Sequence, residues 1–192
     1  MASQNLIQPA AALTMALTLA VLCSGLAAAQ DTQAPQSEAV TLCPSDKTLP
    51  SDKAYPRENL PNETRSYKVW HKKNALREDV VTTKSGLQYK VIQAGIEGGV
   101  SPVAEENVTV HYHGYFPNGH IFDSSYRRGD PSTLPSNRVI KGWIEALRGM
   151  KVCEARTLYL SGKLAYGREG SKGIPPNVTL LFNIQLIDVD RK

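Results

Sequence analysis

The sequence predicts an α+β domain in which a curled, half-open antiparallel sheet wraps around one short helix, with a separate N-terminal helix before it. Segments that alternate apolar and polar residues recur through the second half of the chain, and a period of two is typical of strands with one buried face. The dipeptide Asn118-Gly119 is a strong hairpin signal because both residue types tolerate positive φ. One helical stretch, Ile140 to Arg148, lies among these strands, and Gly149 follows it at a position where helices commonly end. These features together favour a layered α+β domain.

The expected elements of the domain follow one another in a simple order. Lys84-Ser85-Gly86 interrupts the chain, and Leu87, Tyr89 and Val91 then alternate as a first strand. Asp130 to Asn137 contains two prolines and small polar residues, which predicts a loop. The other strands are expected at Asn107–Tyr115, from His120 onward, at Val152–Leu160 and at Thr179–Val189.

The first 29 residues have the features of a signal peptide. Ala10 to Leu22 is an apolar run of about 13 residues, which is too short to span a bilayer, and Ala27-Ala28-Ala29 provides a small-residue cleavage site. No lysine or arginine precedes the run, so a membrane anchor is the competing interpretation. We expect a secreted or periplasmic protein that begins near Gln30 and has no membrane span in its mature form.

The segments between the signal peptide and the first strand are expected to differ in character. Residues 30–61 are rich in Pro, Ser, Asp and Lys, which predicts a disordered or extended tail. Residues 62–83 are expected to form an N-terminal helix and linker, with Asn62 as its cap. Its apolar side chains are Tyr67, Trp70, Leu76 and Val80, and they make no regular stripe. The helix is expected to dock on its own domain; the alternative is a helix-mediated dimer.

Composition excludes some functions and leaves the cysteines open. The net charge is +4, but the lysines and arginines are scattered without interleaved aromatic residues, so we expect no nucleic-acid partner. Removal of the signal segment leaves Cys43 and Cys153, which form either a disulfide or two free thiols. His111 and His113 share one face of a strand without an evident third ligand, so a solvent-facing pair is expected and no metal site. Sequons at Asn62, Asn107 and Asn177 matter only in a eukaryotic secretory pathway.

An ordered series of aromatic motifs runs through the domain. The motifs are Val110–Tyr115, Ile121–Ser125, Val139–Trp143, Leu164–Gly167 and Ile174–Phe182. In this order and spacing, the series resembles the FKBP-type peptidyl-prolyl cis-trans isomerases over roughly Gly86 to Asp190. The layout, with a helix before the domain, is similar to the secreted macrophage-infectivity-potentiator type. Residues 84–192 are therefore expected to be the isomerase domain.

The resemblance implies a pocket that grips the proline of a peptide without any cofactor. Trp143 would be its floor, Tyr166 a hydrogen-bond donor at its rim, and Asp123 an acceptor for Tyr112 that also pairs with Arg128. The implied walls are Tyr112, Phe122, Val139, Ile140 and Phe182, with Ile174 closing one side. The implied catalytic residues are Asp123, Tyr166, Tyr112, Phe122 and Trp143. Proline-containing peptides or proteins, and the macrolides tacrolimus and rapamycin, are the implied partners.

Two departures from the family pattern affect the rim of this pocket. Ser132, with Leu134 nearby, stands where the family often has an aromatic wall residue, and Ser171 or Lys172 stands where some members carry histidine. The expected function is therefore rotation of X-Pro bonds by a secreted enzyme, with a virulence-associated role as one extension of the resemblance. The alternative is a non-catalytic module that binds proline peptides or acts as a chaperone.

Overall fold

The computed structural model describes residues 42–51, 53 and 67–191. The expected signal peptide at 1–29, most of the 30–61 tail and the cap Asn62 lie outside the described residues. Among the helices that the structure describes, none is long and apolar enough to cross a membrane.

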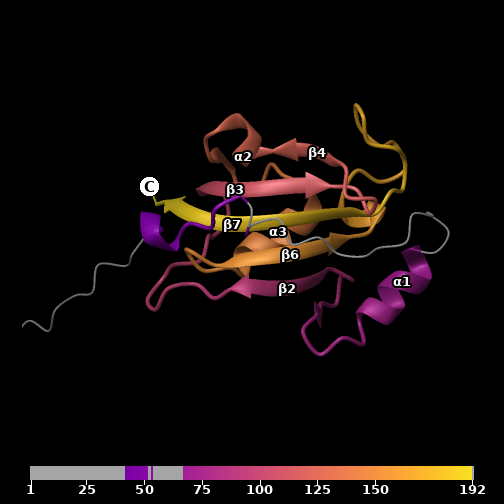
Figure 1. The fold of residues 1–192 in the computed structure, drawn as a ribbon, viewed down its shortest axis with the longest axis horizontal. Coiled ribbons are helices and arrows are strands. Elements are labelled where there is room, and N and C mark those ends of the chain that lie inside the picture. Colours follow the sequence, from indigo (N-terminus) through magenta and orange to yellow (C-terminus); the bar gives the residue numbers. More distant parts are fainter. Residues whose placement is uncertain (1–41, 52, 54–66, 192) are drawn as a thin grey trace, which may run out of the picture. The chain divides into compact units, whose positions relative to one another are not determined.

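An antiparallel sheet forms the centre of the described domain (Figure 1). Its strands are β1 (Val81–Thr82), β2 (Gln88–Gln93), β3 (Asn107–Tyr115), β4 (Ile121–Ser124), β5 (Ser132–Pro135), β6 (Ala155–Leu160) and β7 (Leu180–Asp190). They are ordered β1-β2-β6-β7-β3-β4, with β5 paired to β3 beside that path. The long central pair, β3 and β7, is in register from Asn107 opposite Asp190 to Tyr115 opposite Leu181. The expected α+β class, with a sheet that does not close, is confirmed.

The short helix α3 (Lys141–Arg148) packs against one face of the sheet and supplies much of the main core. Trp143, Ala146 and Leu147 are buried, and they meet the even-numbered residues of β7, from Leu180 to Leu186. Burial of these apolar side chains, at about 25 cal/mol per Å² of apolar surface, is the main force that holds the helix to the sheet. The helix expected between Ile140 and Arg148 is thus present, with Ile140 as its N-cap residue.

The odd-numbered residues of β7 are also buried, which alternation alone does not predict. Leu181 belongs to a second, smaller cluster with Tyr115, Tyr159 and Val80 on the face opposite to α3. Gln185, farther along the same face, accepts a hydrogen bond from the backbone N–H of Leu49 and is 1% exposed. Segments that precede the sheet in the chain therefore cover its second face.

One of these covering segments is the helix α1 (Tyr67–Asn74), which ends at Asn74, before the end of the stretch expected to be helical. The ring centroid of Trp70 lies 5.5 Å from that of Tyr159, and Val80 is buried after the helix ends. These contacts confirm docking of the helix on its own domain. Leu76 does not take part, because 83% of its surface is exposed.

The other covering segment, residues 42–51, is called here the N-terminal strap. It contains the short helix η1 (Ser45–Lys47) and begins with a bond from the Cys43 N–H to the Ile187 carbonyl. Cys43 forms a disulfide with Cys153, so the first of the two alternatives for these cysteines is the one observed. The strap belongs to the segment 30–61, which was expected to be a disordered or extended tail. In the structure, the strap lies along the sheet.

One local expectation was wrong, and one element was not expected. The segment Asp130 to Asn137 was expected to be a loop, but its centre forms β5, because an edge strand that pairs only with β3 can accommodate prolines at its ends. A one-turn helix, α2 (Ser125–Arg128), also follows β4 and was not expected. Ser124 caps it by accepting a bond from the Arg127 N–H, and Gly129 ends it with φ of 90°. The serine cap and the glycine after Arg128 are the local signals of this helix.

Candidate active site

Most of the sequence-predicted site residues surround one cavity of about 400 Å³. Eight of the ten predicted residues line it: Tyr112, Phe122, Asp123, Val139, Ile140, Trp143, Tyr166 and Phe182. Leu134 and Arg138 complete the lining. The volume falls within the range of about 300–1,000 Å³ that is usual for small-ligand and peptide side-chain sites. We call this the proline cavity, after the ligand that the sequence resemblance implies for it.

Four aromatic rings give the proline cavity a fixed shape. Trp143, which is 5% exposed, meets Tyr112 edge-on at 5.0 Å between ring centroids and Phe182 edge-on at 5.3 Å. Phe122 meets Phe182 edge-on at 5.7 Å. Edge-to-face contacts contribute about 0.5–1.5 kcal/mol each beyond the burial of area, so each ring restrains its neighbours.

Gly114 on β3 is what allows the two phenylalanine rings to come this close. A Cβ at this position would lie 2.8 Å from Cε1 of Phe182 and 2.9 Å from Cζ of Phe122. Carbon atoms normally approach no closer than about 3.5 Å at the optimum, so any side chain here would displace both rings. The glycine therefore belongs to the construction of the cavity, although it does not line it.

Asp123 is the only carboxylate among the described residues of the lining, and a hydrogen-bond network holds it in place. The Tyr112 hydroxyl donates to it at 2.6 Å, and the Arg128 guanidinium forms an ion pair with its other oxygen. Arg128 also donates to the Tyr112 hydroxyl and to Ser132 Oγ, both at 2.9 Å. Arg128 is thus outside the lining, and its guanidinium braces two residues that are in it.

The network determines the charge states at this wall. Burial raises the pKa of Asp123, but hydrogen bonds from Tyr112 and Arg128 outweigh it and hold the pKa below its usual value. Burial, and then the bond to Asp123, raise the pKa of the Tyr112 phenol. The carboxylate is therefore ionised and the phenol protonated at neutral pH.

Two unpaired donors lie at the edge of the cavity. Burial and the negative charge of Asp123 raise the pKa of Tyr166, so its hydroxyl keeps its proton. Among the described residues, this hydroxyl has no hydrogen-bond partner, and neither has the backbone N–H of Ile140. Both groups are available to donate hydrogen bonds to a ligand in the cavity.

Sequence reasoning misplaced two groups of residues around the site. Ile174 is not in the lining, because mutual backbone bonds with Ser171 turn the loop and bury its side chain in the main core. The face of His111 and His113 is not open to solvent: His113 is 3% exposed, and Tyr126 of α2 stacks on both imidazoles. No group of three metal-ligating side chains occurs in the part of the chain that the structure describes.

Two lining residues, Leu134 and Arg138, were not in the predicted set. Leu134 lies on β5, near the position where the family often has an aromatic wall residue. It was not in the predicted set because the segment was expected to be a loop. Arg138 precedes the recognisable Val-Ile-Lys-Gly-Trp motif, and no spacing rule marks it.

Comparisons with known proteins bear on the same region. Residues 98–187 match the family model described as FKBP-type peptidyl-prolyl cis-trans isomerase, and residues 3–91 match the one described as a domain amino terminal to it. The peptidyl-prolyl cis-trans isomerase Mip of Coxiella burnetii is 48% identical over 120 residues, which cover 62% of this chain and 51% of that protein. The chain spans about half the length of the curated relatives it matches.

Solved structures agree with the sequence matches. The crystal structure of FkpA from Escherichia coli is similar with a TM-score of 0.62 and 39% identity, over 66% of this chain and 58% of that one. The crystal structure of AtFKBP13 has a TM-score of 0.54 and 36% identity, and the match covers 58% of this chain and 98% of that one.

Proposed function

This chain belongs to the family of FKBP-type peptidyl-prolyl cis-trans isomerases, and on that premise we propose that it catalyses rotation about X-Pro bonds in peptides and proteins. The observation that carries the proposal is the proline cavity, in which aromatic walls above Trp143 are combined with two unpaired donors at the rim. The expected substrates have an apolar residue before the proline.

The chemistry needs no covalent step. Rotation is slow in water because amide resonance must be broken, at a barrier of about 18–20 kcal/mol. The twisted transition state is less dipolar than the planar amide, so a dry aromatic cavity favours it. Trp143, Tyr112, Phe122 and Phe182 supply that environment in this chain.

Polar groups at the rim would orient the peptide and act on the twisted bond. The Tyr166 hydroxyl and the Ile140 N–H donate to carbonyls of the substrate on either side of the proline. The Asp123 carboxylate keeps the Tyr112 ring in position and biases the field at the rotating amide. Arg128 is a positioning residue in this scheme, because it acts only through Asp123 and Tyr112.

Secretion is part of the proposal and rests on the sequence. The apolar run and cleavage site within residues 1–29 support export, and the Cys43–Cys153 disulfide is compatible with an oxidising compartment. A role in virulence and binding of tacrolimus or rapamycin are suggested by the same family relationship.

A cis–trans exchange assay by NMR, without a coupling protease, tests the proposed activity. The full chain is expected to accelerate exchange in an apolar-X-Pro tetrapeptide, and Trp143→Leu is expected to lose most of that rate. Trp70→Leu is the matched control, because Trp70 lies on α1 and does not line the proline cavity. A peptide that binds without faster exchange would instead establish the alternative, a non-catalytic proline-binding module.

A further inference from the structure

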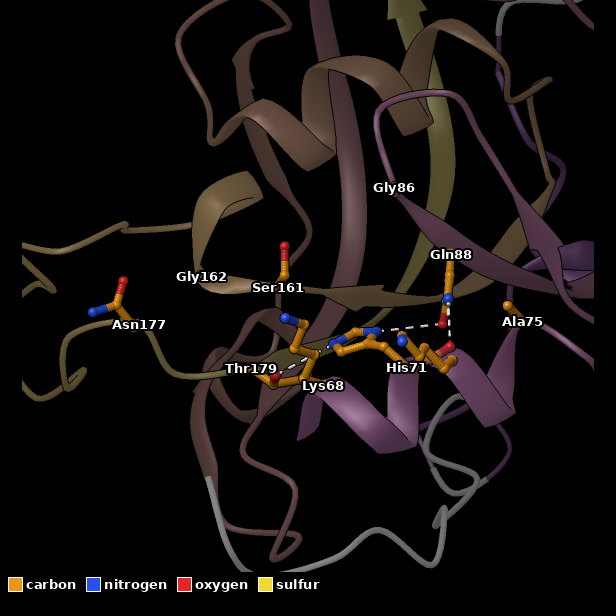
Figure 2. Close-up of a pocket in the computed structure, with 10 residues that line it drawn as sticks. Lys68, His71, Ala75, Gly86, Gln88, Ser161, Gly162, Asn177 and Thr179 are labelled. Carbon is orange, nitrogen blue, oxygen red and sulfur yellow. Dashed lines mark hydrogen bonds between the residues drawn. The ribbon is translucent and has the colours of Figure 1, made fainter. Parts of the chain in front are cut away.

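A second cavity, of about 510 Å³, lies between α1 and one end of the sheet (Figure 2). It is lined by Lys68, His71, Lys72, Ala75, Gly86, Gln88, Ser161, Gly162, Asn177 and Thr179. Lys68 and His71 extend from α1 on one side, and Ser161 and Gly162 lie across from them. Nothing in the proposed rotation chemistry uses this cavity, which we call the α1 cavity.

Buried hydrogen bonds hold the helical wall of the α1 cavity in place. The two ring nitrogens of His71 lie 3.3 Å from Gln88 Oε1 and 3.3 Å from Thr179 Oγ1. Gln88 in turn donates to the His71 carbonyl at 2.8 Å and accepts from Asn74 at 2.9 Å. Gln88, Thr179 and Asn74 are each at most 5% exposed. Because these bonds hold the helix to β2 and to the residue just before β7, the cavity is a built feature of the domain.

Among the residues that the structure describes, those that line the α1 cavity include two lysines and no carboxylate. Lys68 and Lys72 are four residues apart on α1, which places both ammonium groups on the same face of the helix. Neither lysine forms a salt bridge with any residue that the structure describes. Like charges at this spacing repel each other, and a bound anion would relieve the repulsion. Ser161 and Asn177 add neutral donors suited to the same ligand.

One short wall separates the α1 cavity from the proline cavity. Gly162 lines the α1 cavity, and its carbonyl accepts a hydrogen bond of 2.7 Å from the N–H of Gly167. Gly167 directly follows Tyr166, which lines the proline cavity. The Gly167 carbonyl accepts from Asn177, another residue of the α1 cavity, at 2.7 Å. An extended peptide covers about 3.3 Å per residue, so a chain of a few residues is enough to lead from the proline cavity across this short wall.

We propose that the α1 cavity is a subsite for acidic side chains in the polypeptide whose proline occupies the proline cavity. The proposal rests on the proposed isomerase function and adds a substrate class to it: X-Pro sequences with Asp or Glu a few residues from the proline. Polypeptide is the favoured source of the anion because the neighbouring cavity already holds a peptide chain.

The physics of exposed ion pairs determines how this subsite acts. Each lysine–carboxylate pair at an exposed site increases affinity by a factor of about 1.4 to 5, and salt screens it. The pairs form far from the rotating bond, so they stabilise the ground state and the transition state equally. The subsite therefore lowers KM for acidic substrates and leaves kcat unchanged.

The test uses matched peptides with one X-Pro core and a short Gly-Ser spacer leading to three glutamates or three glutamines, on either side of the core. In low salt, we expect the wild-type chain to have a kcat/KM about three to ten times higher for the glutamate peptide than for the matching glutamine peptide, with the acidic run on one side of the core. The whole difference is expected to lie in KM. Lys68→Gln/Lys72→Gln is expected to abolish this preference, and so is 0.5 M salt, at which screening lengths fall to about 4 Å. The charge-reversed Lys68→Glu/Lys72→Glu is expected to favour a peptide with three lysines.

Lys73→Gln is the matched control, because Lys73 lies on the same helix but does not line the α1 cavity. The subsite is overturned if Lys73→Gln loses the glutamate preference to the same extent. It is also overturned if the wild-type chain turns over the glutamate and glutamine peptides at equal rates. Inhibition by millimolar inorganic phosphate without any glutamate preference also overturns it, in favour of a free-anion site. The glutamine peptide reports on the isomerase itself: if no peptide is turned over, the proposed function fails. In that case, fluorescence anisotropy of a labelled glutamate peptide compares its affinity for the wild-type chain and for Lys68→Gln/Lys72→Gln. A lower affinity for the variant supports the subsite independently of turnover, and an equal affinity overturns it.

Discussion

Replacing Gly114 with alanine tests whether the positions of the phenylalanine walls determine the rate. The new Cβ would lie 2.8 Å from a Phe182 ring carbon and 2.9 and 3.0 Å from two Phe122 ring carbons. Reaching a separation of about 3.5 Å requires each ring to move by roughly 0.5–0.7 Å. Overpacking of this kind costs about 1–3 kcal/mol of stability.

The loss of activity is expected to exceed the loss of stability. Displacing catalytic surfaces by about 1 Å can lower rates by about a hundredfold, so we expect kcat/KM of Gly114→Ala to fall about ten- to a hundredfold. The melting temperature is expected to fall by only about 2–12 °C. The variant therefore stays folded if the activity is assayed at a low temperature of about 15 °C. NMR exchange of an X-Pro tetrapeptide measures the first quantity, and thermal melting by circular dichroism measures the second.

Gly149→Ala is the matched control for this substitution. A Cβ there would come no closer than 3.4 Å to any atom, and φ is an ordinary −97°. Its activity is expected to stay within about twofold of wild type, as for surface substitutions that change stability by less than about 0.5 kcal/mol. A Gly114→Ala variant that is folded and fully active would refute the view that the spacing of Phe122 and Phe182 limits the reaction.

Four further outcomes are expected. Asp123→Ala should lower kcat/KM by about tenfold or more, since a hydrogen bond to a charged group contributes about 1.5–3 kcal/mol. Asp123→Asn should lose less activity. Wild-type activity in the alanine variant would exclude a role for the carboxylate. Tyr166→Phe should cost about fivefold, the value of one neutral hydrogen bond near 1 kcal/mol, and a hundredfold loss would show that the hydroxyl does more than donate. Cys153→Ser opens a loop with a sequence separation of 110 residues and should lower the free energy of unfolding in urea by about 2–5 kcal/mol; an unchanged urea midpoint would contradict a stabilising disulfide. Burial lowers the pKa values of His71, His111 and His113, so below pH 6.5 the unfolded chain binds more protons and the melting temperature should fall between pH 7 and pH 5; a flat profile would show that these rings do not control stability.

The sequence was informative wherever local spacing carries the signal. Strand alternation, the hairpin at Asn118-Gly119 and the helix before Gly149 are all local patterns, and the aromatic motifs placed eight residues in one lining. The sequence could not reveal that Tyr159 and Leu181 are covered by α1, because that contact joins segments far apart in the chain.

The same limit explains the histidines. On a strand, His111 and His113 alternate with Tyr112, so they were correctly placed on the opposite face. That face is covered by Tyr126 from the unexpected turn α2, and Ser51 of the strap lies 3.2 Å from the His113 ring. Alternation identifies the two faces of a strand but does not say which of them another segment covers.

The two faces of β7 also separate parts of the protein on which natural selection can act independently. On one face Leu180, Phe182, Ile184 and Leu186 belong to the main core, and Phe182 lines the proline cavity; on the other face Leu181 packs near α1 and Gln185 binds the strap. Related chains can therefore replace or recombine their amino-terminal segments without altering a single ring of the cavity. Substitutions in α1 would alter the α1 cavity, and with it the choice of substrate, while the proline cavity stays the same.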